Sequence, residues 1–328
     1  QPPNREGRRV NAPGFLLTAA ARAVLLLLLA GLGTGCFQRP TVGARPDETV
    51  FYGETARIRG LDPARAGDVP SSLAIGKLYE GLYQYAYIAR PYRLEPALAE
   101  AMPEISEDGR VYTIRVRRGV YFSDDPCFTA TGGRGRELTA ADFVYAIKRI
   151  ADVRNESTGY WAFGERIEGL DAFRAASLEA GAAGIDYDRP VEGLQTPDSH
   201  TLRIVLTRPY PQLVWILAMH YAYAVPREAV TYYDGRNGRP FFHQHPVGTG
   251  PYRLVSWRRN YRIEFERNPV WTQTGRIERY PSDGEPDDAA RGLLAAAGRP
   301  IPFIDRIVQV VIEDPSTQWL LFLRGEVE

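Results

Sequence analysis

Lysine is almost absent from this sequence of 328 residues, because Lys77 and Lys148 are the only two among 40 basic residues. The other 38 are arginines, and 40 acidic residues balance them to a formal net charge of zero. This balance leaves no excess of positive charge for binding a nucleic acid. Hydrophobic residues make up 44% of the chain, which excludes a largely disordered protein and predicts a sizeable core.

The motifs of several enzyme classes are also missing. No Gly-x-Ser-x-Gly nucleophile elbow occurs, and the single Gly76-Lys77 pair is followed by Leu78, so there is no phosphate-binding loop. Cys127 has no histidine near it in the sequence that could activate it as a nucleophile. The sequence therefore predicts neither catalytic residues nor a cofactor, and it indicates a protein that is not an enzyme.

Histidine is scarce as well, and among the four in the chain only His243 and His245 lie close together. On an extended strand their rings would share one face, an arrangement that could hold a metal ion. No Cys, Asp or Glu lies within several residues of them, so we interpret both as loop histidines before Pro246 and predict no metal site. A secreted metal-dependent hydrolase that uses this pair and an acid is the alternative from another functional class.

The N-terminal region carries the pattern of an export signal. Arginines at positions 5, 8, 9 and 22 precede the apolar run 23–30, which is shorter than the roughly 20 residues that span a bilayer. Small residues and then Cys36 follow, which resembles the site at which lipoproteins are cleaved and acylated. We predict a signal peptide at 1–35, a lipid anchor on Cys36 and a linker at 36–48; if Cys36 is acylated, Cys127 has no disulfide partner. The alternative is an ordinary signal peptide that is cut near Gly35 and releases a secreted protein.

Alternating and apolar segments predict a mixture of strands and helices. We expect strands at 49–52, 201–206, 261–265 and 304–312, and a hairpin formed by 112–116 and 118–122. Helices are expected over 73–82 with Ser71 or Ser72 as N-cap, after Thr139 with Asp142 in a capping box, and from Pro315 to Gly325. The Gly- and Pro-rich segment 272–302 predicts a long loop with one short helix at 289–297. Without regular βαβ alternation, the fold class is α+β with mixed sheets.

Several ordered blocks resemble the family 5 extracellular solute-binding proteins, the oligopeptide-, dipeptide- and nickel-binding receptors of ABC importers. The most specific block starts at Ser106-Glu107-Asp108-Gly109, runs through residues 112–124 and resumes at 138–145. The other blocks are Leu61-Asp62-Pro63, Leu78-Tyr79-Glu80-Gly81-Leu82, Pro96-Ala97-Leu98-Ala99-Glu100, Asp198-Ser199-His200-Thr201-Leu202, Val225-Pro226-Arg227, the stretch 246–252, Glu266-Arg267-Asn268-Pro269 and Gly325-Glu326-Val327-Glu328. Together they cover about residues 50 to 328.

The resemblance implies the two-lobed fold of the type II periplasmic binding proteins. Members of the family are considerably longer, and their Gly-Glu element lies near the crossing into the second lobe. The sequence is therefore expected to be a C-terminally truncated fragment with the first lobe present and most of the second missing. We expect residues 49–79 and 196–328 to form the core sheet domain of the first lobe, with residues 80–195 as its accessory subdomain.

The resemblance also implies a function, that of a lipid-anchored, monomeric periplasmic receptor which captures oligopeptides for an ABC permease in the inner membrane. It implies that Asp68 and Val69 pair with the peptide backbone and that Tyr160 faces the cleft, the alternative being a surface loop and a core aromatic. The insertion at 132–135 and the segment 272–302 depart from the family pattern. They leave open a receptor for another solute, such as a nickel chelate, a sugar or an antibiotic.

Overall fold

The structure, a computed structural model, describes residues 49–54, 56–236, 240–273 and 278–327. The predicted signal peptide, Cys36 and the linker lie outside these residues. No helix in the described ranges is long and apolar enough to cross a membrane.

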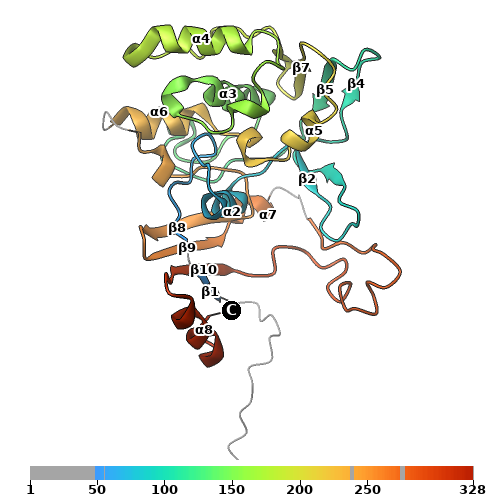
Figure 1. The fold of residues 1–328 in the computed structure, drawn as a ribbon, viewed down its shortest axis with the longest axis vertical. Helices are drawn as coiled ribbons and strands as arrows, with labels where there is room; N and C mark the ends of the chain where they lie inside the picture. Colours follow the sequence, from blue (N-terminus) through green and yellow to red (C-terminus); the bar gives the residue numbers. More distant parts are fainter. Residues whose placement is uncertain (1–48, 55, 237–239, 274–277, 328) are drawn as a thin grey trace, which may run out of the picture. The chain divides into compact units, whose positions relative to one another are not determined.

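The first sheet is mixed and joins residues from both ends of the described chain (Figure 1). Its strand order is β1 (Thr49–Glu54), β10 (Arg306–Val311), β9 (Arg262–Arg267) and β8 (Tyr252–Arg258). β1 runs parallel to β10, whereas β10 with β9 and β9 with β8 are antiparallel. The strands expected at 49–52, 261–265 and 304–312 are confirmed, and Ile307 and Val308 of β10 are buried as the apolar run predicts.

The second sheet is antiparallel and corrects one expectation. Its order is β4 (Glu104–Ile105), β5 (Val111–Arg115), β7 (Thr201–Val205) and β6 (Leu194–Asp198). The predicted hairpin between 112–116 and 118–122 is wrong, because β5 pairs with β4 and β7. The residues after β5 form hydrogen bonds with other parts of the chain. The Arg117 N–H donates to the Leu98 carbonyl, and the Gly119 N–H donates to the Glu137 carboxylate at 2.7 Å. A separate hairpin pairs β2 (Tyr83–Tyr85) with β3 (Leu94–Pro96).

Helix α2 (Val69–Leu78) begins earlier than the sequence predicted. Asp68 is its N-cap, and the two oxygens of its carboxylate accept hydrogen bonds from the Ser71 N–H at 2.9 Å and the Ser71 hydroxyl at 3.0 Å. The expected caps, Ser71 and Ser72, lie inside the helix, whose first turn accepts Pro70 because an N–H is not needed there. The helix ends at Leu78, because Tyr79 is extended, with φ −128° and ψ 163°, and the Leu78 carbonyl accepts from the Gly250 N–H at 2.9 Å.

Helix α3 (Ala140–Ala151) has the predicted capping box, in which the Thr139 N–H donates to Asp142 Oδ2 at 2.8 Å. The helix expected after Pro315 is α8 (Pro315–Arg324), and Gly325 ends it with a left-handed φ of 72°. The short helix expected at 289–297 is wrong: this stretch forms turns, and Gly292 has a φ of 75° that a helix does not accommodate. The other α-helices are α4 (Leu170–Ala180), α5 (Leu213–Ile216), α6 (Arg227–Arg236) and α7 (Pro269–Gln273).

Short 3-10 turns connect these elements. They lie at Thr129–Thr131, Val153–Asn155, Tyr160–Ala162, Gly181–Ala183, His220–Ala222 and Phe242–Gln244. The predicted division into a core domain and an accessory subdomain stays a prediction. Its boundary at 195/196 falls inside β6, so a boundary after Val205 would keep the second sheet in one part.

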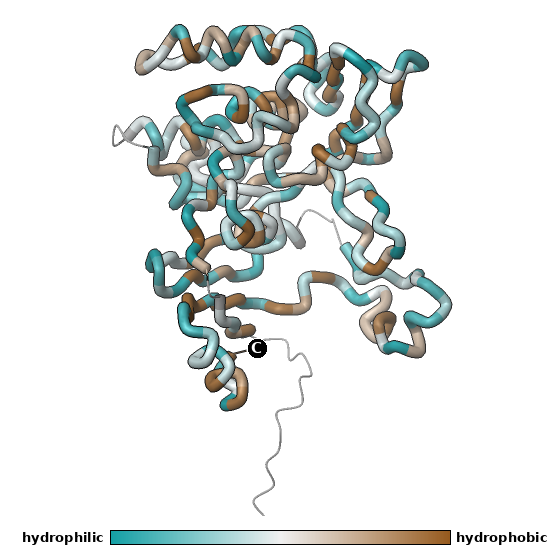
Figure 2. Tube along the Cα trace, viewed as in Figure 1, coloured by the Kyte–Doolittle hydropathy of each residue, from teal (hydrophilic) through white to brown (hydrophobic). Residues whose placement is uncertain are grey.

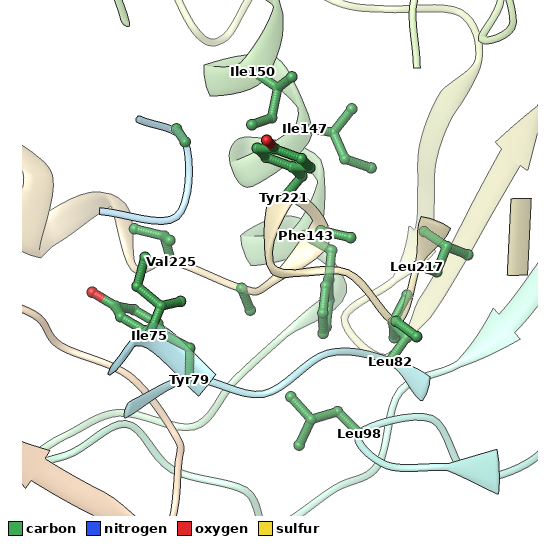
Figure 3. Close-up of a cluster of buried hydrophobic side chains, with 14 of the residues drawn as sticks. Ile75, Tyr79, Leu82, Leu98, Phe143, Ile147, Ile150, Leu217, Tyr221 and Val225 are labelled. Carbon is green, nitrogen blue, oxygen red and sulfur yellow. The ribbon is translucent and has the colours of Figure 1, made fainter. Parts of the chain in front are cut away.

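The hydrophobic core joins α2, α3 and the segment 217–225. Figure 3 shows Ile147 and Ile150 of α3 close to Tyr221, with Ile75 and Tyr79 of α2 near Val225. In contrast, α8 buries none of its side chains against described residues, and its coil carries hydrophobic residues in Figure 2. The core therefore lies on the α2 and α3 side of the first sheet.

A buried ion pair ties the Leu61-Asp62-Pro63 turn to α3. The two oxygens of Asp62 each accept a hydrogen bond of 2.7 Å from the Arg149 guanidinium, and both side chains are about 2% exposed. Burial alone would raise the pKa of Asp62, but the charge and hydrogen bonds of Arg149 outweigh it and lower that pKa. Asp62 also accepts from the Ala64 N–H, so the whole carboxylate is satisfied.

Replacing Arg149 with Ala is expected to lower the free energy of unfolding by about 3–5 kcal/mol, because Asp62 would remain buried without a partner. Chemical denaturation followed by circular dichroism measures this value. The control is Arg203→Ala, an exposed position on β7, which we expect to cost under about 0.5 kcal/mol. Because the folded pKa of Asp62 lies below its ordinary value of 3.8, its contribution is complete above that pH and is lost as the pH falls through the folded pKa. Equal losses for both variants would contradict the role of the ion pair.

Removing the helix cap with Asp68→Ala is expected to cost about 1 kcal/mol, because two donors of Ser71 lose their acceptor. Asp68→Asn is the matched control, since its amide oxygen still accepts from the Ser71 N–H. Thermal unfolding of both variants measures the difference. A variant carrying Asn that is as unstable as the one carrying Ala would show that the cap is not the stabilising feature.

Candidate ligand-binding site

A cavity of about 560 Å³ opens beside the start of α2. It is lined by Arg59, Gly60, Arg65, Ala66, Gly67, Asp68, Thr158, Pro240 and His243. The Leu61-Asp62-Pro63 turn lies within this run of chain, and the Asp62 carbonyl accepts from the N–H groups of Arg65 and Ala66 at 3.1 Å each. The buried ion pair of Asp62 thus holds one wall of the cavity.

Gly67 and Asp68 line this cavity, and Val69 follows them as the first residue of α2. In the described ranges no hydrogen bond engages the N–H groups of Gly67, Asp68 or Val69. Gly67 is exposed and the Val69 side chain is 70% exposed, whereas the Asp68 carboxylate is occupied by the helix cap. Asp68 and Val69 can therefore meet a ligand through their backbone, as the sequence predicted, although no ligand contact tests that prediction.

Gly67 and Gly159 allow two parts of the chain to approach closely on the side of the cavity formed by Thr158. A Cβ on Gly67 would lie 2.8 Å from Thr158 Oγ1, and a Cβ on Gly159 would lie 2.3 Å from the Tyr221 ring. Thr158 Oγ1 is in turn 2.9 Å from the Tyr221 hydroxyl. The side chain of Thr158 is thereby fixed at the cavity, a role that the sequence analysis missed although it named Tyr160, two residues later.

Tyr160 does not line this cavity. Its hydroxyl donates to the Asp171 carboxylate, and the Arg174 guanidinium lies 4.1 Å from the centre of its ring. Burial and the nearby Asp171 raise the pKa of Tyr160, so the phenol stays protonated. The role of Tyr160 in ligand binding stays a prediction. Of residues 158–160, Thr158 is the one that lines the cavity.

Two histidines border the same region in neutral form. His220 Nε2 is 3.0 Å from the Ala66 carbonyl and must carry the proton there, because a carbonyl only accepts. Burial lowers the pKa of His220. The pKa of His243 is lowered by burial and then by the positive charges of Arg259 and Arg65. Neither imidazole therefore supplies a positive charge at neutral pH.

The His243-Gln244-His245 segment forms a 3-10 turn and not the extended strand that a shared metal face needs. The His245 ring stacks on Tyr233 at a centroid distance of 4.4 Å, while His243 Nε2 lies 3.1 Å from the Gln244 side-chain amide. Among the described residues, no group of three or more His, Cys, Asp or Glu is placed to hold a metal ion. No observation of this segment favours the alternative of a metal-dependent hydrolase.

A second cavity, of about 750 Å³, lies between α3 and α6. Its arginines are paired with acids: Arg136 with Asp142 and Glu228, and Arg227 with Asp188. The buried Lys148 donates to the carbonyls of Tyr187 and Arg189 at 2.9 and 2.8 Å. None of the predicted site residues lines this cavity, so the cavity at α2 is the candidate site.

Known proteins similar to this chain share the predicted class. The chain is 28% identical over 249 residues to the "Probable ABC transporter periplasmic-binding protein SapA" of Escherichia coli, covering 74% of this chain and 42% of that protein. It is 27% identical over 254 residues to the "Periplasmic oligopeptide-binding protein OppA" of Salmonella typhimurium, covering 77% and 42%. The chain thus spans less than half the length of these relatives.

The fold is also that of solved binding proteins. The periplasmic binding protein DppA from Helicobacter pylori, in complex with the peptide STSA, superposes with a TM-score of 0.62 at 23% identity, over 87% of this chain and 46% of that one. This likeness confirms the predicted class of mixed helix and sheet. Residues 93–328 match the family model "Bacterial extracellular solute-binding proteins, family 5 Middle". The chain belongs to family 5 of the bacterial extracellular solute-binding proteins.

Proposed function

We propose that this protein is the peptide-binding receptor of an ABC importer and that it binds its ligand in the cavity at the start of α2. The observation that carries the proposal is the row of unengaged N–H groups at residues 67–69 beside that cavity. The similar proteins reported above, an oligopeptide-binding protein and a binding protein in complex with a peptide, support it.

An extended peptide can pair with alternate members of this set, the N–H groups of Gly67 and Val69, because successive N–H groups of an extended segment point to opposite sides. Backbone donors in an exposed segment pair with the carbonyls of an added strand, so affinity comes from the main chain and side-chain identity matters less. Asp68 is extended, with φ −124° and ψ 153°, as strand pairing needs. The closing of a second lobe over the ligand would then signal to the permease that the receptor is loaded.

The proposal places the receptor in the periplasm as a monomer, tethered to the membrane by acyl chains on Cys36. Support for the tether is the apolar run 23–30 followed by small residues and Cys36. A receptor for a nickel chelate or a sugar remains the alternative within the class, because the segment 272–302 departs from the family pattern.

Val69→Pro tests the backbone pairing directly. Val69 is the first residue of α2, where proline is well tolerated, and the preceding Asp68 is already extended, so the fold should persist. With the protein expressed from its complete reading frame, we expect wild type to bind short peptides in calorimetry and Val69→Pro to bind them about tenfold more weakly, since one donor is lost.

Val69→Ala is the matched control, because it shortens an exposed side chain and keeps the N–H. We expect its affinity to equal that of wild type. If no pool of di- to pentapeptides binds wild type, the peptide assignment fails. If Val69→Pro binds as well as Val69→Ala, the ligand does not pair with this N–H.

Cys36→Ala tests the tether. If Cys36 is acylated, the wild-type protein should fractionate with membranes and incorporate a radiolabelled fatty acid, and the variant should do neither. Cys127→Ala is the matched control, because that thiol is buried and should not affect labelling. A soluble wild-type protein without label would support cleavage near Gly35 and secretion instead.

A further inference from the structure

Positive charge gathers at the candidate site although the chain as a whole is neutral. The cavity beside residues 67–69 is lined by Arg59 and Arg65. A neighbouring cavity of about 480 Å³ shares Arg59 and Asp68 with it and adds Arg57 and Arg259. The two cavities therefore form one arginine-lined region around Asp68.

Most of these arginines lack an acidic partner. Arg57 pairs with Glu313, but in the described ranges Arg59, Arg65 and Arg259 take part in no ion pair. Arg259 donates a hydrogen bond of 3.2 Å to the Arg59 carbonyl and lies over the Trp257 ring, 5.5 Å from its centre, and neither contact neutralises its charge. In the cavity between α3 and α6, by contrast, Arg136 and Arg227 are both paired with acids.

The acids nearby do not neutralise the three guanidinium groups. Asp62 is paired with Arg149, and Asp68, hydrogen-bonded to Ser71, is the one described acid that lines the two cavities, so a single negative charge faces three guanidinium groups. Burial is the largest cause of the lowered pKa of His243; the charges of Arg259 and Arg65 lower it further, while Asp62 and Asp234 act in the opposite direction. Three like charges in one region repel each other, and a bound anion would relieve that repulsion.

We propose that Arg59, Arg65 and Arg259 bind a carboxylate of the ligand, so that the receptor prefers acidic peptides. The inference rests on the proposed function, because the peptide backbone would lie along residues 67–69 and its carboxylate in the region that Asp68 borders. Guanidinium groups bind carboxylates with two parallel hydrogen bonds, which gives specificity as well as affinity. The test must separate an acidic side chain of the peptide from the C-terminal carboxylate, which every peptide carries and which would give no preference for acidic peptides.

Matched peptides distinguish these two carboxylates. The protein is expressed from its complete reading frame and titrated by calorimetry with an acidic tetrapeptide, with the same peptide carrying Gln for Glu, and with its C-terminal amide. Loss of about tenfold in affinity on changing Glu to Gln assigns the side chain, and the same loss on amidation assigns the C-terminus. The preference should weaken as salt rises, because salt screens exposed charges.

Arg59→Gln and Arg65→Gln should each remove most of the preference while still binding the neutral peptide. Arg203→Gln, exposed on β7, is the control and should behave as wild type. Arg59 is exposed, so its variant keeps the test valid if Arg65→Gln fails to fold, as thermal unfolding would show. Equal affinity for all three peptides would overturn the inference and leave the proposed function standing. No binding of any peptide would overturn both.

Discussion

The buried pair of Asp62 and Arg149 is the interaction on which the candidate site depends. The loop that turns at Leu61-Asp62-Pro63 packs Leu61, Ala64 and Ala66 into the core, and the bidentate bonds from α3 add a polar link to it. The same aspartate uses its carbonyl to order Arg65 and Ala66, and the Ala66 carbonyl meets His220. The position of residues 67–69 follows from these bonds, because the chain between them and Asp62 is only four residues long.

Because this loop is held in place, the backbone N–H groups of Gly67 and Asp68 are available to a ligand in the cavity. The Asp68 carboxylate caps α2 by accepting hydrogen bonds from Ser71. The side chain of this predicted ligand contact therefore chiefly stabilises the start of the helix. The glycines at 67 and 159 allow Thr158 and Tyr221 to close the opposite wall. Recognition through the main chain suits a receptor of varied peptides, and the unpaired arginines would add a preference for charge.

Local patterns predicted the elements whose signals lie within a few residues. The capping box at Thr139, the apolar run of β10 and the Gly325 terminus of α8 were read correctly. Errors arose where distant residues compete for the backbone. Residues 118–122 alternate like a strand, yet the partners of β5 come from β4 and from β7, some ninety residues later. Asp68 was missed as a cap because Ser71 and Ser72 are equally good capping residues by type.

The sequence by itself determined the family and the class of mixed helix and sheet, because these depend on ordered local blocks and on residue type. Only the tertiary structure decided that Arg149 partners Asp62, that Thr158 and not Tyr160 reaches the cavity, and that Arg59, Arg65 and Arg259 gather there. The physical reason is distance along the chain: Asp62 and Arg149 are 87 residues apart, and Arg59 and Arg259 are 200 apart, so no local pattern records their meeting.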